Sequence, residues 1–274
     1  MPAFLVRTLL VAANTAGEAV RQRYFLVLGL LAAVVAGLAS SMRGMTFGED
    51  LKFTADLGFG ALFFFGSLLA VVLPVHLFFS ELDNRTALTL LARPLRRGEF
   101  LAGKLLGVWA LLAAMVALVS GVTIAMVVAR HAELAEAAAV RQLPPPVFES
   151  GGALLFAVLQ ATRLGVVAAL TLFTCSYART ALFAYGAGFG WLVAGQTAWL
   201  GREWFGRSPD TGNKVLVTVL RAVPDLQAFN LGDALMFPAR AMPVADSWKL
   251  IAAGIVWMAV LTALGARLFR NREI

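Results

Sequence analysis

The sequence predicts an all-α polytopic membrane protein with six transmembrane helices, an N-terminal interfacial helix and a cytoplasmic coupling helix. Hydrophobic residues make up 60% of the 274 positions, charged residues only 14%, and the mean hydropathy is +0.80. A soluble domain needs far more polar surface than this to cover its core. Six apolar runs also reach or approach the roughly 20 residues that span a bilayer as a helix. Because backbone inside lipid must satisfy its own hydrogen bonds, runs of this length are expected to be helical.

The six predicted spans account for most of the chain and form one transmembrane domain over residues 1–274. They cover residues 24–42, 57–79, 105–129, 153–176, 180–200 and 249–268. Only the fourth span carries a charged residue in its interior, Arg163. The sequence shows no convincing repeat and no second, soluble domain. The long loop 201–248 is only partly polar, and its 225–236 portion is expected to form short helices in the outer leaflet.

The first 23 residues predict an amphipathic helix at the cytoplasmic membrane interface. Polar and charged residues recur at helical spacing on one side of this segment, while apolar residues occupy another side. A helix of this kind lies in the interface plane with its apolar face in the lipid. A disordered, lightly basic tail is the alternative interpretation. The polar side carries Arg7, Asn14, Glu18 and Arg21, and the apolar side carries Leu5, Leu9, Ala12, Ala16 and Val20.

Basic residues gather on one side of the predicted spans and therefore set their orientation. Short cytoplasmic loops carry an excess of Lys and Arg. In this chain such residues precede the first span, lie in the loops after the second and fourth spans, and follow the sixth. Both termini are therefore expected in the cytoplasm, with the loop 201–248 on the other side. The net charge of +7 is explained by this asymmetry and by anionic membrane lipids, so no nucleic-acid partner is expected.

The segment between the second and third spans, residues 80–104, predicts a short helix on the cytoplasmic side. Thr86 is a suitable N-cap for this helix, and Pro94 ends it. Leu90 and Leu91 supply an apolar contact surface on a loop that otherwise faces water. Arginines that follow them are expected to pair with acidic groups of another protein or with lipid phosphates. The alternative is an ordinary basic loop that only sets the topology.

Residues in and around this loop resemble the membrane subunits of type-2 ATP-binding-cassette exporters. That family has six helices and a cytoplasmic coupling helix after the second one. The tight turn at 176–179 and the stretch 224–230 are also similar to family features. One position departs from the pattern, since Arg85 stands where the family commonly has Gly. The matching loop residues are Glu81, Thr86, Leu90, Leu91, Pro94, Arg97, Gly103 and Lys104.

The resemblance implies a permease subunit of the cytoplasmic (inner) membrane that works with an ATP-binding-cassette ATPase subunit. A second copy of the chain, or a similar permease, is expected to complete the pathway. ATP and Mg²⁺ are expected only in the ATPase, because Gly98–Lys104 is followed by Leu105 where a phosphate-binding loop requires Ser or Thr. No cofactor, catalytic residue or metal ligand is expected in this chain. The resemblance assigns ATPase coupling to Glu81, Thr86, Leu90, Leu91, Pro94 and Arg97.

Three residues inside the predicted spans are candidates for further roles. Arg163 is costly at membrane depth, and by default it marks a pathway, a partner or an anionic substrate. The alternative is that its side chain snorkels to the membrane surface. Gly186 and Gly190 have the small-xxx-small spacing of close helix packing, with the lining of a conduit as the alternative.

Two other classes of protein remain as alternatives, a stand-alone secondary transporter and a membrane-embedded enzyme. A secondary transporter of this kind is expected to show internal repeats and acidic residues within its spans. An intramembrane enzyme needs converging carboxylates or histidines. The chain shows neither pattern, and its only histidines are His76 and His131. The direction of transport rests on the resemblance alone, and nothing in the sequence indicates the substrate.

Overall fold

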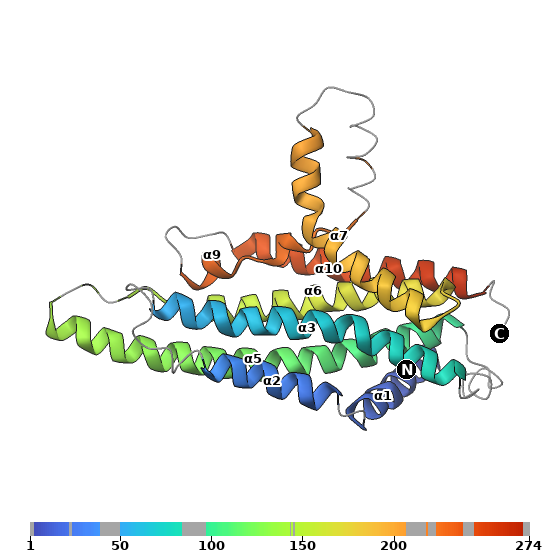
Figure 1. Ribbon diagram of the computed structural model, residues 1–274, viewed down its shortest axis with the longest axis horizontal. Coiled ribbons are helices and arrows are strands. Elements are labelled where there is room, and N and C mark those ends of the chain that lie inside the picture. Colours follow the sequence, from blue (N-terminus) through green and yellow to red (C-terminus); the bar gives the residue numbers. More distant parts are fainter. Residues whose placement is uncertain are drawn as a thin grey trace.

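The computed structural model describes residues 3–21, 24–38, 50–83, 97–142, 144, 146–206, 218, 223–237 and 244–270. Within these ranges every regular element is a helix, and the long helices run side by side along one axis (Figure 1). We call the end of the bundle where α3 ends and α5 begins the loop end, and the opposite end the far end. The elements are α1 (Ala3–Arg21), α2 (Tyr24–Leu38), α3 (Asp50–Asp83), α5 (Arg97–Val140), α6 (Ser150–Tyr177), α7 (Ala181–Gly206), the 3-10 helix η2 (Gln227–Phe229), α9 (Gly232–Met236) and α10 (Val244–Arg270).

Among the described helices, four are long and apolar enough to cross a membrane: α3, α5, α6 and α10. They coincide with the predicted spans 57–79, 105–129, 153–176 and 249–268, which confirms the helical, polytopic character of the chain. The other two predicted spans correspond to α2, of which 15 residues are described as helix, and to α7. Neither belongs to the four, so the count of six spans stays a prediction.

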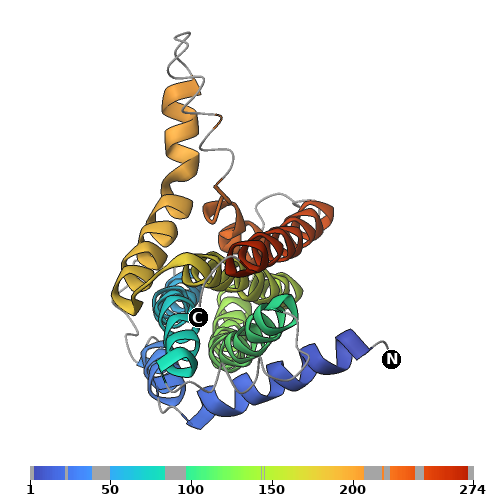
Figure 2. The same ribbon diagram turned by 90° about the vertical axis from the view of Figure 1, so that its right-hand side faces the viewer.

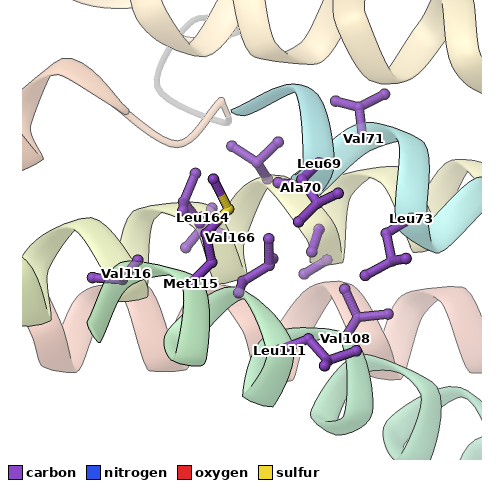
Figure 3. Packing of buried hydrophobic residues seen from close by; sticks show 14 of the residues in the cluster. Leu69, Ala70, Val71, Leu73, Val108, Leu111, Met115, Val116, Leu164 and Val166 are labelled. Atoms are coloured by element: carbon purple, nitrogen blue, oxygen red, sulfur yellow. The ribbon is translucent and has the colours of Figure 1, made fainter. Parts of the chain in front are cut away.

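Helix α6 lies at the centre of the bundle and contacts α3, α5, α7, α9 and α10. Seen along the bundle, the other long helices surround it (Figure 2). Leu164 and Val166 of α6 belong to the same buried cluster as Leu69 of α3 and Met115 of α5 (Figure 3). Lipid tails are as apolar as these side chains, so inside a membrane such a core is held by close van der Waals packing more than by exclusion of water.

A glycine in α6 allows α5 and α10 to approach it closely. A Cβ atom added at Gly165 would lie 2.6 Å from Met258 Sδ and 2.7 Å from Trp109 Cδ1. The indole of Trp109 also donates from Nε1 to the carbonyl oxygen of Ala161 at 2.9 Å. Since no side chain fits at these distances without displacing its neighbours, the packing of these three helices depends on Gly165.

Helix α1 crosses the loop end of the bundle instead of running along its axis (Figure 2). It contacts α5 most extensively and also touches α2 and α3. A Cβ atom at Gly103 would lie 2.8 Å from the carbonyl oxygen of Thr8, and one at Gly107 would lie 2.7 Å from that of Ala12. This glycine pair is therefore the seat of α1 on α5. Apolar residues of α1 such as Leu9 remain exposed, and the location of α1 at a membrane interface stays a prediction.

A very short turn joins α6 and α7, as the sequence predicts. Helix α6 ends at Tyr177 and α7 begins at Ala181, so the two helices are neighbours in space as well as in sequence. The hydroxyl Oγ1 of Thr180 accepts a hydrogen bond from the backbone N–H of Phe183 at 3.3 Å, which caps α7. Farther along, the C-terminal part of α7 turns away from the bundle (Figure 1).

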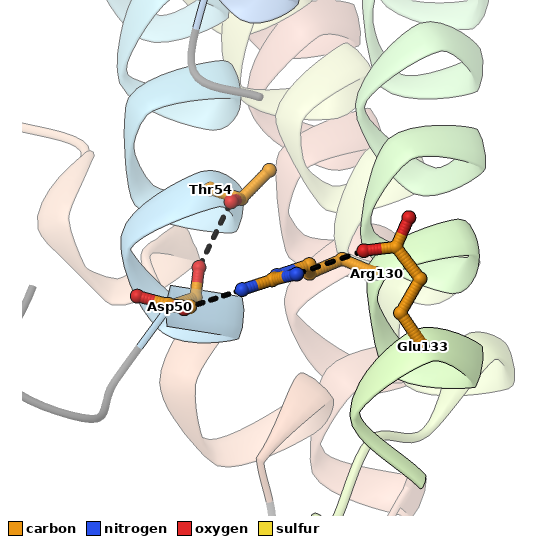
Figure 4. Close-up of polar contacts among 4 residues, drawn as sticks. All are labelled: Asp50, Thr54, Arg130 and Glu133. Carbon is orange, nitrogen blue, oxygen red and sulfur yellow. Dashed lines mark hydrogen bonds and ion pairs between the residues drawn. The ribbon is translucent and has the colours of Figure 1, made fainter. Parts of the chain in front are cut away.

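An ion pair connects α3 and α5 at the far end, and a second one lies beside it within α5. Arg130 of α5 donates to the carboxylate of Asp50 at 2.7 Å and to that of Glu133 at 2.8 Å (Figure 4). Thr54 Oγ1 in turn donates to the carbonyl oxygen of Asp50 at 2.8 Å. Helix α5 extends to Val140, beyond the predicted end of its span at residue 129. The extension is helical but carries charged residues, so hydropathy does not mark it as part of the span.

Candidate functional site

The predicted coupling loop, residues 80–104, begins in the last turn of α3 and ends inside α5. Four of its predicted coupling residues lie outside the described residues: Thr86, Leu90, Leu91 and Pro94. Their assignment to ATPase coupling stays a prediction. Glu81 and Arg97 are described, and they lie in the two helices that flank the loop.

At the base of this loop, a buried ion pair joins α3 to α5. Lys104 Nζ lies 3.0 Å from Glu81 Oε1, with the two side chains only 1% and 7% exposed. The same ammonium group donates to the carbonyl oxygen of Leu77 at 2.7 Å and lies 5.4 Å from the centre of the Phe100 ring. Glu81 is thus almost fully buried within the bundle. Its assignment to ATPase coupling stays a prediction.

Helices α1 and α10 are tied to the same base. Ser80 Oγ donates to Glu18 Oε1 of α1 at 3.3 Å, and Arg7 of α1 forms a 3.9 Å ion pair with Glu99.

Arg97 is predicted to pair with acids of an ATPase or with lipid phosphates. In the structure, its guanidinium donates to the backbone carbonyl oxygen of Phe269 at the end of α10 and lies over the ring of the same residue. Four helices therefore meet where the loop leaves the bundle.

Aromatic rings fill the space between these polar contacts. Phe78 of α3 packs 6.3 Å from Phe100 of α5 and 5.7 Å from Phe269 of α10, measured between ring centres. Phe100 and Phe269 stack on each other at 6.1 Å. The sequence analysis assigns no role to these rings, since nothing local distinguishes them from lipid-facing phenylalanines. Their meeting point follows only from the packing of three helices.

Arg163 is fully buried in the middle of α6, so the snorkelling interpretation is wrong for this chain. Its Nη1 donates to Gln160 Oε1 at 3.0 Å and its Nη2 donates to Ser67 Oγ at 2.6 Å. The guanidinium carbon Cζ lies 3.9 Å from the centre of the Phe63 ring, a cation–π contact. The exposed fraction of the Arg163 residue is 0%, so its guanidinium does not reach the surface of the bundle.

A cavity of about 500 Å³ opens in the far half of the bundle, between α3, α6, α7 and the η2–α9 segment. Aromatic and apolar groups form part of its wall, and amide and carboxylate groups form the rest. Beside it, the η2–α9 segment is fixed to α7 by a hydrogen bond from the Leu226 N–H to the Gly195 carbonyl oxygen at 3.0 Å. The lining residues used in the argument are Asp56, Phe59, Phe63, Phe156, Gln160 and Asp233.

Arg163 and the cavity are adjacent, although Arg163 is not part of the cavity wall. Two residues that line the cavity, Gln160 and Phe63, are also the ones that contact the guanidinium. The charge of Arg163 therefore lies one layer of side chains behind the cavity. The sequence identifies Arg163 from its charge, but Ser67 lies 96 positions away and only the fold brings the two together. A role of Arg163 in a transport pathway stays a prediction.

The two glycines singled out in α7 make no close contact within the described part of the chain. A Cβ atom at Gly186 or at Gly190 would meet nothing within 4 Å. Close packing within the chain falls instead to Gly188, 2.8 Å from Val71 Cγ1, and to Gly195, 2.7 Å from Leu226 Cδ1. Packing through Gly186 and Gly190 therefore stays a prediction.

The fold and these sites define an integral membrane protein built from packed helices, with polar groups enclosed at the base of a loop and beside a cavity. A family model described as ABC-2 family transporter protein matches residues 9–274. The chain belongs to this family, which confirms the resemblance, and it is a membrane component of an ABC transporter. The family is a transport component that implies an ABC ATPase partner, with no catalysis of its own. No curated protein is significantly similar to the chain in sequence.

Proposed function

We propose that the chain is the permease subunit of an exporter of the inner membrane, driven by ATP that a separate subunit hydrolyses with Mg²⁺. The family match over residues 9–274 supports this assignment. The structural observation that carries it is the buried ion pair between Glu81 and Lys104. This pair fixes together the two helices that the predicted coupling loop connects.

Coupling in this proposal is mechanical. A force on the loop reaches α3 and α5 together, because the Glu81–Lys104 pair makes their ends one unit. Both helices also pack on α6, which carries Arg163 at its centre. Packed helices slide or rotate as units instead of deforming continuously, so a shift at the loop end is passed to the bundle centre.

A second permease, identical or similar, completes the pathway in this proposal. Helix α7 offers a surface for it, with Leu182 82% exposed and Val193 62% exposed. Gly186 and Gly190 lie on the same helix and would let another helix approach closely. Membrane lipids cover the remaining apolar surface, with both termini in the cytoplasm.

The test of the proposal uses the leucine pair of the loop. We expect the double substitution Leu90→Asp and Leu91→Asp to weaken association with the ATPase by orders of magnitude, because each buried leucine contributes about 1.5–3 kcal/mol. The measurement is co-purification with a candidate ATP-binding-cassette subunit, followed by ATPase activity in lipid. Thr89→Asp is the matched control, since it adds a charge to the same loop without removing an apolar contact.

A clear negative result is available for this test. If the double-Asp protein inserts normally, co-purifies with the ATPase and stimulates it as the parent does, the loop only sets the topology. The assignment of the chain as an ATP-coupled permease then loses its main support. Normal insertion is checked by detergent extraction and gel filtration of both variants.

A further inference from the structure

We infer that the cavity in the far half of the bundle binds a molecule that joins an anionic group, phosphate or carboxylate, to an apolar body. The charge of Arg163 attracts the anionic group, and the phenylalanines of the cavity contact the apolar body. Binding is a property of this chain alone. Only the identification of such a molecule as transported cargo rests on the proposed function.

The first step is that, within the described part of the chain, Arg163 has no counterion. Its two hydrogen bonds go to neutral oxygens, those of Gln160 and Ser67. Among the described residues no carboxylate pairs with it, and its buried Nε has no hydrogen-bond partner there. A buried cation without a counterion is unfavourable and is retained mainly at functional sites. An anionic ligand would supply the missing charge.

The second step is that the cavity gives a ligand access to this charge. Gln160 and Phe63 lie between the guanidinium and the cavity and contact both. Across one layer of side chains, in a medium of low dielectric constant, the attraction between opposite charges is far stronger than in water. An anionic group at the Gln160 side of the cavity therefore feels Arg163 through a single layer of side chains.

The third step concerns the shape and polarity of the cavity. Phe59 and Phe156 pack edge to face at 4.9 Å and form an aromatic wall next to Phe63. Both lining carboxylates belong to solvent-exposed residues, and the first of them, Asp56, precedes Phe63 by seven residues on α3, about 10 Å along the helix axis. The other lining carboxylate, Asp233, pairs with Lys52 at 3.0 Å. Negative charge thus lies on exposed groups of the lining, while the positive charge of Arg163 is buried behind Gln160 and Phe63.

Three soluble probes of one size test this assignment on the full chain in phosphatidylcholine nanodiscs. They are 1-naphthyl phosphate, 1-naphthylmethanol and 1-naphthylmethylamine, which share an aromatic body and differ in charge. Titration calorimetry should show that the phosphate binds ten- to hundredfold more tightly than the alcohol, about the effect of one hydrogen bond to a charged group. Equal affinities, or a preference for the amine, would overturn the inference.

Substitution of the arginine supplies an independent measurement. Arg163→Gln should remove the preference for the phosphate probe, whereas Arg163→Lys should keep part of it because the charge remains. Arg130→Gln is the matched control, because it removes an arginine charge from the same half of the bundle without altering the cavity lining. An unchanged phosphate affinity in a folded Arg163→Gln chain would refute the inference. If that variant does not fold, the probe ranking on the parent chain still decides.

The source of the anionic group is resolved by the lipid of the nanodisc. If the natural ligand is a lipid phosphate, nanodiscs with phosphatidic acid should weaken the binding of 1-naphthyl phosphate by competition. If the natural ligand is a soluble organic anion, the binding of 1-naphthyl phosphate should be the same in nanodiscs of either lipid composition. These measurements need no ATPase. A chain that binds the probe but does not associate with the ATPase subunit therefore contradicts the proposed function and leaves this inference intact.

Discussion

Two buried cations in this bundle have opposite surroundings, and the difference separates a structural role from a binding role. Lys104 faces a carboxylate, a backbone carbonyl and an aromatic ring within a closed base. Among the described residues, Arg163 contacts neutral groups, the oxygens of Gln160 and Ser67, and it lies next to a cavity. Within the described residues, the buried charge of Lys104 is neutralised by an opposite charge, and that of Arg163 is not. The second charge is therefore the one that a ligand can complete.

The Glu81–Lys104 pair gives a prediction about stability. Lys104→Met should lower the free energy of unfolding by about 3–5 kcal/mol, because removal of one partner leaves a buried charge uncompensated. The double variant Glu81→Leu/Lys104→Met should recover most of this loss, since no charge remains buried. Thermal unfolding of the purified chain in detergent measures both effects.

The control for this prediction is the exposed pair formed by Lys249 and Asp246, whose groups lie 2.8 Å apart. Lys249→Met should leave the stability essentially unchanged, because exposed ion pairs contribute little. A Lys104→Met chain that unfolds at the same temperature as the Lys249→Met chain would show that the Glu81–Lys104 ion pair is not formed.

At the scale of helices, the apolar runs predict where each helix lies but not where it ends. Helix α3 begins at Asp50 and not at residue 57, and α5 continues to Val140. Both extensions carry charged residues, and the Asp50–Arg130 contact joins them, which hydropathy cannot reveal. The seat of α1 is equally hidden, because Gly103 and Gly107 look like any other glycines of an apolar segment.

The seat of α1 gives a prediction at this scale. Gly107→Leu should displace α1 and destabilise the chain by about 1–3 kcal/mol, the usual effect of overpacking. Gly121→Leu is the control on the same helix, since a Cβ there meets nothing within 4 Å. Thermal unfolding and the rate of proteolysis within α1 report the difference. Equal behaviour of the two variants would mean that α1 does not dock on this seat.

The glycines of α7 separate packing inside the chain from packing between chains. Gly188→Leu should lower the unfolding temperature, because a Cβ at Gly188 already comes within 2.8 Å of Val71. Gly186→Leu should leave that temperature unchanged and should reduce the dimer fraction, if α7 contacts a second copy. Light scattering on detergent-purified protein measures the dimer. An unaltered dimer would remove Gly186 from the predicted interface.

At the scale of the whole molecule, the helical membrane fold is predictable from the sequence, while its sites are only partly so. Composition and run length are local properties that survive without knowledge of contacts. Arg163 and Glu81 stand out by their charge, yet their partners Ser67 and Lys104 come from other helices. The cavity joins four separate segments of the chain, so no single stretch of sequence carries a signal for it.

Orientation in the membrane is a property of the whole chain and can be tested directly. In a Cys175→Ser background, Arg179→Cys should react with an impermeant thiol reagent only from the cytoplasm, and Pro144→Cys only from outside. Both positions are exposed and lie at opposite ends of α6. Labelling of position 179 from outside intact cells would invert the topology and place the loop base on the wrong side for an ATPase.

The seat of α1 has a consequence for biosynthesis. Helix α1 leaves the ribosome before α5 exists, because α2 and α3 are made between them. During that interval α1 lacks the helix that it contacts most extensively. Its exposed leucines allow it to rest on the membrane surface meanwhile, which shields apolar side chains from water. If α1 lies at the membrane interface as predicted, its amphipathic sequence acts first, during synthesis, and the two glycines of α5 then fix the helix to the folded protein.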